Sequence, residues 1–94
     1  MKIKSIKPIT LKMPFSHGGN KVIFHGKEWK ELEFNLVRVE TDKGIIGWGE
    51  AFGYTSLKSV KAAIETMVAP LLIGKNLENI PELILTLQKS LHLF

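Results

Sequence analysis

The sequence predicts an α+β domain in which a three-stranded antiparallel sheet is followed by helices that pack on one of its faces. Two patterns of hydrophobic spacing carry this prediction. Apolar and polar residues alternate in the first half of the chain, which is typical of strands, whereas apolar residues recur every three or four positions in the second half, which is typical of helices. The 94 residues contain no repeat, low-complexity stretch or long linker, so we expect residues 1–94 to form a single domain.

The first strand is expected at about residues 2–13, and Pro14 should end it. Apolar residues alternate regularly with polar ones over its second half, but Ile3 and Ile6 do not share one phase. Pro8 lies between the two halves and cannot donate a ladder hydrogen bond. A bulge or an edge position near Pro8 explains both features.

Two further strands are expected at about residues 31–41 and 45–51. They are joined by a short turn in which Gly44 is available for a positive φ, so the pair forms a hairpin. The first of the two has apolar residues on both faces, and Phe34 is expected to face the core. It therefore needs cover on both sides, which the central strand of a sheet with helices on one face would have.

The first helix is expected at about residues 56–69. Thr55 or Ser56 can supply the N-cap oxygen. Pro70 should end or kink the helix, which would leave residues 68–73 as a separate short turn. The expected apolar stripe consists of Leu57, Val60, Ile64, Met67 and Leu71.

The second helix is expected at about residues 80–92. Asn79 and Glu82 stand at capping-box spacing, and Pro81 is tolerated in the first turn, where no intrahelical donor is needed. The chain stops on an apolar segment at residues 91–94 without a C-cap glycine, which indicates that the sequence continues in the intact protein.

The composition indicates that another domain or chain covers part of the surface. Hydrophobic residues make up 45% of the chain, and its mean hydropathy is slightly positive. A domain of this length buries only about 60 to 65% of its unfolded surface, so it has more apolar area than it can hide. The alternative is a compact core with ordinary surface leucines.

Several classes of protein are excluded. The absence of cysteine rules out a disulfide framework, a thiolate zinc site and a thiol nucleophile. The amino terminus alternates lysine with apolar residues and is not a signal peptide, and no stretch approaches the ~18 apolar residues of a membrane span. We therefore expect a soluble, cytoplasmic protein.

The net charge of +4 is unevenly distributed. Residues 1–30 contain seven lysines and one glutamate, whereas the remainder is slightly acidic. Such lysines either attract anionic partners or form the solvated side of an edge strand, where they discourage aggregation. Glu40 and Asp42, on either side of the hairpin turn, are expected to be ordinary solvated charges.

Candidates for catalysis are few. His17 and His25 could pair with Glu28 or Glu31, but their spacing in a glycine-rich loop matches no metal motif. Ser16 adjoins His17, yet neighbours in sequence do not make a nucleophile and its base. Neither of the glycine-rich phosphate-binding motifs is present.

The segment Gly47-Trp48-Gly49-Glu50 is unusual for a strand. Glycines weaken a strand unless something approaches its backbone closely, and Trp48 would stack across that bare surface. Glu50 falls on the same side as Trp48. We expect it to be partly buried with a hydrogen-bond donor as its partner, the alternative being a glutamate at a rim with its carboxylate in water. All four residues are expected to be structural.

Three segments together resemble the amino-terminal capping domain of the mandelate racemase and muconate cycloisomerase (muconate lactonizing enzyme) branch of the enolase superfamily. They are MKIKSIKPITLKMP, LVRVETDKGIIGWGEAFG and VKAAIETMVAPLLIGKN. The resemblance covers nearly the whole chain, although residues 15–30 match only in position. GWGEAFG and the final LHLF are closer to the mandelate racemase side.

The resemblance implies that this domain precedes a modified TIM barrel, whose strand ends carry the chemistry. In such enzymes a lysine or histidine base removes a proton α to a carboxylate, and Mg²⁺ stabilises the enediolate. The base and the metal ligands belong to the barrel. The chain by itself would then have no catalytic residue, metal ligand or cofactor and no activity. Its implied partners are the barrel, a small carboxylate substrate of the full enzyme and a second copy in a homo-oligomer.

The resemblance also implies that two loops of this domain close the barrel mouth, exclude water and select the substrate. By position these loops are residues 15–30 and the AFGYTS stretch after Glu50. Tyr54 can supply both an aromatic wall and a hydroxyl. The candidate pocket residues are Phe15, His17, Phe24, His25, Trp29, Phe52 and Tyr54; for each aromatic the alternative is core packing.

Two other functions are compatible with parts of the pattern. A basic sheet with Phe34, Trp48 and Tyr54 could stack on bases in a nucleic-acid-binding module, but no RNP-like motif is present. A free-standing interaction protein could dimerise through its apolar helices. Neither alternative predicts the GWGE and APLLIG segments.

Overall fold

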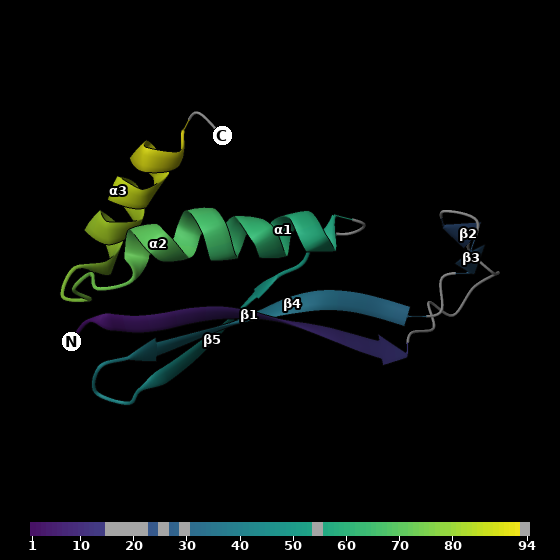
Figure 1. The fold of residues 1–94 in the computed structure, drawn as a ribbon, viewed down its shortest axis with the longest axis horizontal. Helices are drawn as coiled ribbons and strands as arrows, with labels where there is room; N and C mark the ends of the chain where they lie inside the picture. The colour runs from purple at the N-terminus through teal and green to yellow at the C-terminus, as the bar shows by residue number, and fades with distance from the viewer. Residues whose placement is uncertain (15–22, 25–26, 29–30, 54–55, 93–94) are drawn as a thin grey trace.

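A computed structural model describes residues 1–14, 23–24, 27–28, 31–53 and 56–92 of the chain. Three antiparallel strands form one sheet in the order β1-β4-β5, and the helices lie over one of its faces (Figure 1). The predicted α+β class and the central position of the second predicted strand are therefore confirmed. The three strands are β1 (Ile3–Pro14), β4 (Glu31–Thr41) and β5 (Ile46–Ala51).

A second, two-stranded sheet lies within the segment that connects β1 and β4. Strand β2 (Ile23–Phe24) pairs antiparallel with β3 (Lys27–Glu28). Both strands fall within residues 15–30, the segment expected to form the first loop.

Strand β1 is an edge strand with a bulge at its start. The register shifts between Ile3 and Ser5, so Lys4 is an extra residue with no counterpart on β4. The bulge explains why Ile3 and Ile6 are both buried although an odd number of positions separates them. The edge position agrees with Pro8, but the bulge is at Lys4 and not near Pro8.

The pairing of β4 separates the two faces of the sheet. Val37 and Val39 pack against the core beneath the helices. Phe34 lies opposite Leu11 on β1, on the other face. The expectation that Phe34 faces the core was therefore wrong, because alternation alone does not say which face of a central strand the helices cover.

The first helical segment runs past Pro70 without interruption. It consists of α1 (Leu57–Ala63), the π-helical turn η1 (Ile64–Val68) and α2 (Ala69–Leu72). In η1 the Ala69 amide donates to the Ile64 carbonyl, five residues earlier. The wider turn accommodates Pro70, which has no amide to donate and would clash with the preceding turn of a regular α-helix. The expected end of the helix at Pro70 was therefore wrong, whereas an irregularity near Ala69 is present as the π turn that separates α1 from the short α2.

The π turn also changes which residues face the sheet. It contains one residue more than an α-helical turn, so the apolar stripe shifts by one position after it. Ala69 is buried and Leu72 packs on the core, whereas Leu71 is exposed. The predicted stripe is correct at Leu57 and Ile64 but not at Leu71.

The caps of the two helices differ from each other. Asn79 accepts a hydrogen bond from the Glu82 amide at 3.2 Å and donates to the Glu82 carboxylate at 3.1 Å, so the predicted cap of α3 (Ile80–Leu91) is confirmed. Ser56 stands at the N-cap of α1 but makes no side-chain capping bond. Thr55, the other predicted cap, lies outside the described residues.

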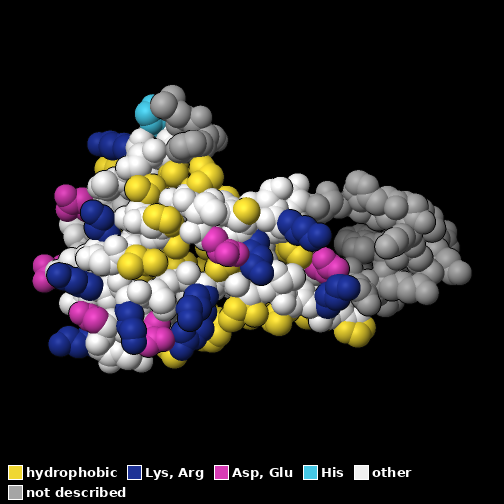
Figure 2. All heavy atoms as spheres, in the orientation of Figure 1, with side chains coloured by type: hydrophobic (Ala, Val, Ile, Leu, Met, Phe, Trp, Pro, Cys, Tyr) yellow, Lys and Arg dark blue, Asp and Glu magenta, His cyan; other side chains and the backbone are white. Residues whose placement is uncertain are grey.

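The buried core is small for a chain so rich in apolar residues. Among the described residues the buried hydrophobic side chains are Ile3, Ile6, Leu57, Ile64 and Ala69. Large apolar side chains remain exposed on both sides of the molecule, below the sheet and around the helices (Figure 2). No helix in the described part of the chain has the length and hydropathy to cross a membrane.

Candidate functional site

The two segments proposed as loops begin and end at one end of the sheet. Strand β1 stops at Pro14 and β4 starts at Glu31, which brackets residues 15–30. Strand β5 stops at Ala51 and α1 starts at Leu57, which brackets residues 52–56. In Figure 1 these four ends lie toward the same end of the molecule, away from α3.

A buried polar side chain lies between the strands that lead to the two loops. Asn35 on β4 is 0% exposed, and it pairs with Ala51, the last residue of β5. Its Oδ1 accepts a hydrogen bond from the Thr10 hydroxyl at 2.9 Å, and its Nδ2 donates to the Leu57 carbonyl at 3.2 Å. One amide therefore links β1, β4 and the first residue of α1.

Asn35 was not among the predicted site residues. Only its polar character within an apolar strand distinguishes it, and a polar residue on an alternating strand is usually assigned to the solvent face. Its role became visible when β4 proved central and the odd-numbered positions of β4 proved to face the helices.

Gly53 fixes the path of the second loop where it leaves β5. Its φ is +84°, and a Cβ at this position would lie 2.6 Å from Cγ2 of Val60 on α1. The Ser56 amide donates to the Gly53 carbonyl at 2.8 Å, which closes the turn. Only glycine satisfies both the positive φ and the close approach.

A groove opens beside this anchor. It has a volume of about 520 Å³ and lies between the sheet and the start of α1. Thr10 and Glu33 line its strand side, and Lys58 and Lys61 contribute positive charge from α1. Glu33 is paired with Lys12 at 3.4 Å.

Most of the predicted pocket residues cannot be placed. Phe52 is half-buried at the start of the second loop. Phe24 belongs to the short strand β2, but its side chain is outside the described part of the structure. The other five lie outside the described residues: Phe15, His17, His25, Trp29 and Tyr54.

The GWGE segment differs from its prediction. Gly47 and Gly49 pair with Val39 and Val37, so they lie on the face beneath the helices, yet a Cβ at either glycine would meet nothing within 4 Å. The expected close approach to the backbone is therefore not made by the described residues. Trp48 is 59% exposed on the opposite face.

The prediction for Glu50 in the same segment was also wrong in part. It shares the open face with Trp48, as expected from alternation, but it is exposed and not partly buried. An exposed carboxylate is hydrated, so it needs no buried donor. This corresponds to the alternative of a glutamate at a rim with its carboxylate in water.

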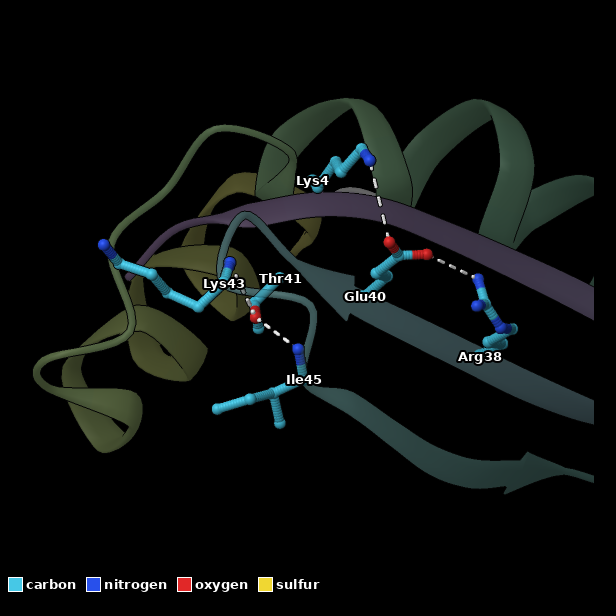
Figure 3. Close-up of polar contacts among 6 residues, drawn as sticks. All are labelled: Lys4, Arg38, Glu40, Thr41, Lys43 and Ile45. Carbon is cyan, nitrogen blue, oxygen red and sulfur yellow. Dashed lines mark hydrogen bonds and ion pairs between the residues drawn. The ribbon is translucent and has the colours of Figure 1, made fainter.

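Both acidic residues near the hairpin turn have partners, contrary to expectation, and Figure 3 shows those of Glu40. Glu40 accepts a hydrogen bond from Arg38 at 3.0 Å and lies 3.6 Å from the Lys4 ammonium. The hydrogen bond from Arg38, followed by the positive charges of Lys4 and Arg38, lowers the pKa of Glu40. Asp42 accepts from the Lys2 amide at 3.0 Å, which lowers the pKa of Asp42.

The turn itself is held by Thr41. Its Oγ1 accepts hydrogen bonds from the amides of Lys43 at 3.3 Å and Ile45 at 3.2 Å (Figure 3). Gly44 adopts a φ of +81°, as predicted for this turn.

The carboxylates do not converge on a cation site. Glu33, Glu40 and Asp42 each have their own basic or amide partner. Within the described ranges no three His, Cys, Asp or Glu side chains are grouped as metal ligands would be. Because Mg²⁺ is held by convergent oxygen ligands, these residues do not fit a Mg²⁺ site.

The fold and sequence are similar to those of known enzymes. The chain is 37% identical over 65 residues to muconate cycloisomerase 1 of Acinetobacter baylyi, a match that covers 61% of this chain and 18% of that protein. A member of the enolase superfamily from Polaromonas sp. JS666 superposes with a TM-score of 0.75 at 27% identity, over 95% of this chain and 23% of that one. The L-Ala-D/L-Glu epimerase of Bacillus subtilis superposes with a TM-score of 0.74 at 27% identity, over 97% of this chain and 26% of that one.

These relatives are about four times as long as this chain, so it corresponds to one part of each. The family model of the mandelate racemase / muconate lactonizing enzyme N-terminal domain matches residues 22–93, which is most of the chain. The chain therefore belongs to the N-terminal capping-domain family of the mandelate racemase and muconate lactonizing enzymes, in the enolase superfamily.

Proposed function

We propose that this chain is the lid and specificity domain of a Mg²⁺-dependent enzyme that abstracts a proton α to a carboxylate. The match of residues 22–93 to the family model carries the proposal. The activities of the relatives, a muconate cycloisomerase and an epimerase, support a reaction of the cycloisomerase, racemase or epimerase type, with an acid-sugar dehydratase as a further member of the class. We place the enzyme in the cytoplasm.

The catalytic barrel is proposed to lie outside these 94 residues. Two observations support this division: the chain spans about a quarter of its solved relatives, and the carboxylates of Glu33, Glu40 and Asp42 are each paired with another group of this chain. The barrel would supply the base and hold Mg²⁺, which stabilises developing negative charge on a substrate carboxylate. This chain would be inactive by itself.

The contribution of this chain would be to close the barrel mouth. Both loops leave one end of the sheet, as a two-part lid requires. Closure would exclude water and bring aromatic side chains against the part of the substrate distal to its carboxylate. The residues proposed for this contact are Phe15, His17, Phe24, His25, Trp29, Phe52 and Tyr54.

The partners would be the barrel, a small carboxylate substrate and a second copy of the enzyme. The large apolar side chains exposed on both sides of the domain support the expectation of covering surfaces.

The first experiment addresses the chain by itself. We expect no Mg²⁺-dependent racemase, epimerase or dehydratase activity and no tight Mg²⁺ binding in a calorimetric titration. A tight stoichiometric Mg²⁺ site on the isolated chain would contradict the proposed division between lid and barrel. The coding sequence around the chain should contain a (β/α) barrel with a K-x-K motif and spaced Asp and Glu residues at strand ends.

The second experiment tests the lid in the longer protein. Tyr54→Phe removes a hydroxyl and should raise KM about tenfold for substrates with a polar distal group, but not for those with an apolar one, while the Mg²⁺ affinity stays unchanged. Ser90→Ala, which also removes a hydroxyl but from the exposed surface of α3, is the matched control and should alter neither constant. Equal KM values of wild type and Tyr54→Phe across both substrate groups would exclude a substrate contact by this residue.

A further inference from the structure

Asn35 lies among the four elements from which the two loops emerge, namely β1, β4, β5 and α1. Thr10 and Asn35 are each four residues from the ends of β1 and β4 that bracket the first loop, about 13 Å along each strand. Ala51, opposite Asn35, ends β5 at the start of the second loop, and Leu57 begins α1 at the end of that loop. One side chain therefore contacts or adjoins every element from which a loop emerges.

The chemistry of this contact favours a fixed geometry. A buried amide that lost its partners would carry an uncompensated desolvation penalty, so the surrounding structure must keep both of its bonds. The Thr10 hydroxyl donates to Oδ1 and the Leu57 carbonyl accepts from Nδ2, so the acceptor and the donor are both engaged. An apolar side chain at this position would pack but would not specify where α1 begins along the sheet.

We propose that Asn35 is a positioning residue that anchors Leu57, the residue at which the second loop passes into α1, to the two strands that carry the first loop. By holding the Leu57 carbonyl against β4 and the Thr10 hydroxyl of β1, it keeps the start of α1 at one position relative to the sheet. Gly53 assists from the other side, because its close approach to Val60 sets the distance between loop and helix. The role of the loops in closing the barrel mouth rests on the proposed function. The anchoring by Asn35 does not depend on that function.

Amide hydrogen exchange on the 94-residue chain tests this inference without any assay of activity. In Asn35→Leu we expect the amides of Ser56 and Val60, which close the second loop onto α1, to exchange about tenfold faster than in the wild type relative to the amides of the β4–β5 turn. Acceleration that is uniform over the chain, or absent at Ser56 and Val60, would overturn the proposal.

Thr41→Val is the matched control. Thr41 is another buried polar residue on the helix-facing side of β4, and its hydroxyl serves only the turn at the opposite end of the sheet. This variant should accelerate the amides of Lys43 and Ile45, which donate to the Thr41 hydroxyl, and leave Ser56 and Val60 unchanged. If it accelerated Ser56 and Val60 as much as Asn35→Leu does, the effect of Asn35 would be general stability and the proposal would be wrong.

A milder pair of variants keeps the test decisive if Asn35→Leu does not fold. Thr10→Val removes the hydroxyl that Asn35 accepts, whereas Thr10→Ser retains it. We expect faster exchange at Ser56 in the valine variant and wild-type exchange in the serine variant. Equal exchange in both would contradict the anchor. Because exchange and Mg²⁺ binding are measured separately, the anchoring and the proposed function can fail independently.

Discussion

Among the described residues, Gly53 shows how one position can determine the path of a loop. We expect Gly53→Ala to lower the free energy of unfolding by about 2–4 kcal/mol, because a left-handed φ costs about 1 kcal/mol and the contact with Val60 adds the cost of overpacking. Gly44→Ala is the control, since its φ is similar but nothing lies within 4 Å of its Cβ, and it should lose only about 1 kcal/mol. Urea denaturation measures both; equal losses would show that Val60 moves aside without cost.

Acid should weaken the bulged start of β1. Folding lowers the pKa of Glu40 and of Asp42, so the stability from these carboxylates is complete above their ordinary pKa values of 4.5 and 3.8. It is lost as pH falls through the lower values of the folded state, where both groups become protonated. Thermal unfolding between pH 6 and pH 2 should therefore show a falling Tm.

The variant Glu40→Gln shows how much of the fall in Tm with acid is due to Glu40. The variant cannot titrate at position 40, so the decline of its Tm with acid should be shallower than that of the wild type, with Asp42 accounting for part of the remainder. Superimposable pH profiles of the two proteins would assign the acid sensitivity to other carboxylates. Salt should reduce the effect, most strongly at Asp42, because Asp42 is exposed whereas Glu40 is half-buried.

At the scale of elements, the π turn η1 decides which leucine of the helix reaches the core. Leu72→Ala should cost about 1–3 kcal/mol, because Leu72 packs against the buried cluster, whereas Leu71→Ala should cost about 0.5 kcal/mol or less. The two variants delete the same atoms from adjacent positions, so each is the control for the other. A regular α-helix through Pro70 would give the reverse order in chemical denaturation.

At the scale of the whole molecule, none of the described residues covers the face of the sheet opposite the helices. Ile9, Leu11 and Met13 of β1 are each more than a third exposed there, and Trp48 of β5 lies on the same face. An uncovered apolar surface of this kind binds dyes and neighbouring molecules. It is one of the surfaces on which a partner would be expected.

Trp48→Lys should therefore reduce the binding of an apolar dye and any self-association of the isolated chain. The free energy of unfolding should change by about 0.5 kcal/mol or less, because the side chain is already exposed. Gln88→Lys adds the same charge on exposed α3 and should change neither property. Dye fluorescence and sedimentation velocity provide the measurements, and equal dye binding by both variants would show that the open face is not the surface responsible.

Features that depend on neighbouring residues could be predicted from the sequence alone. Alternation identified the strands, the 3.6-residue period identified the helices, Gly44 marked the turn, and Asn79 with Glu82 marked the cap of α3. Each is a matter of local geometry, and the residues that satisfy it lie within a few positions of one another. The resemblance to the capping-domain family also depended on such contiguous segments.

What only the tertiary structure decided were the features whose partners are distant in sequence. Because the odd-numbered residues of β4 face the helices, Phe34 lies on the open face and Asn35 is buried. Because the π turn η1 precedes Pro70, Leu72 packs on the core in place of the predicted Leu71. The anchor at Asn35 joins residues 25 and 22 positions away, and Gly53 is constrained by a side chain on α1. Packing between elements selects these contacts, so no local pattern could reveal them.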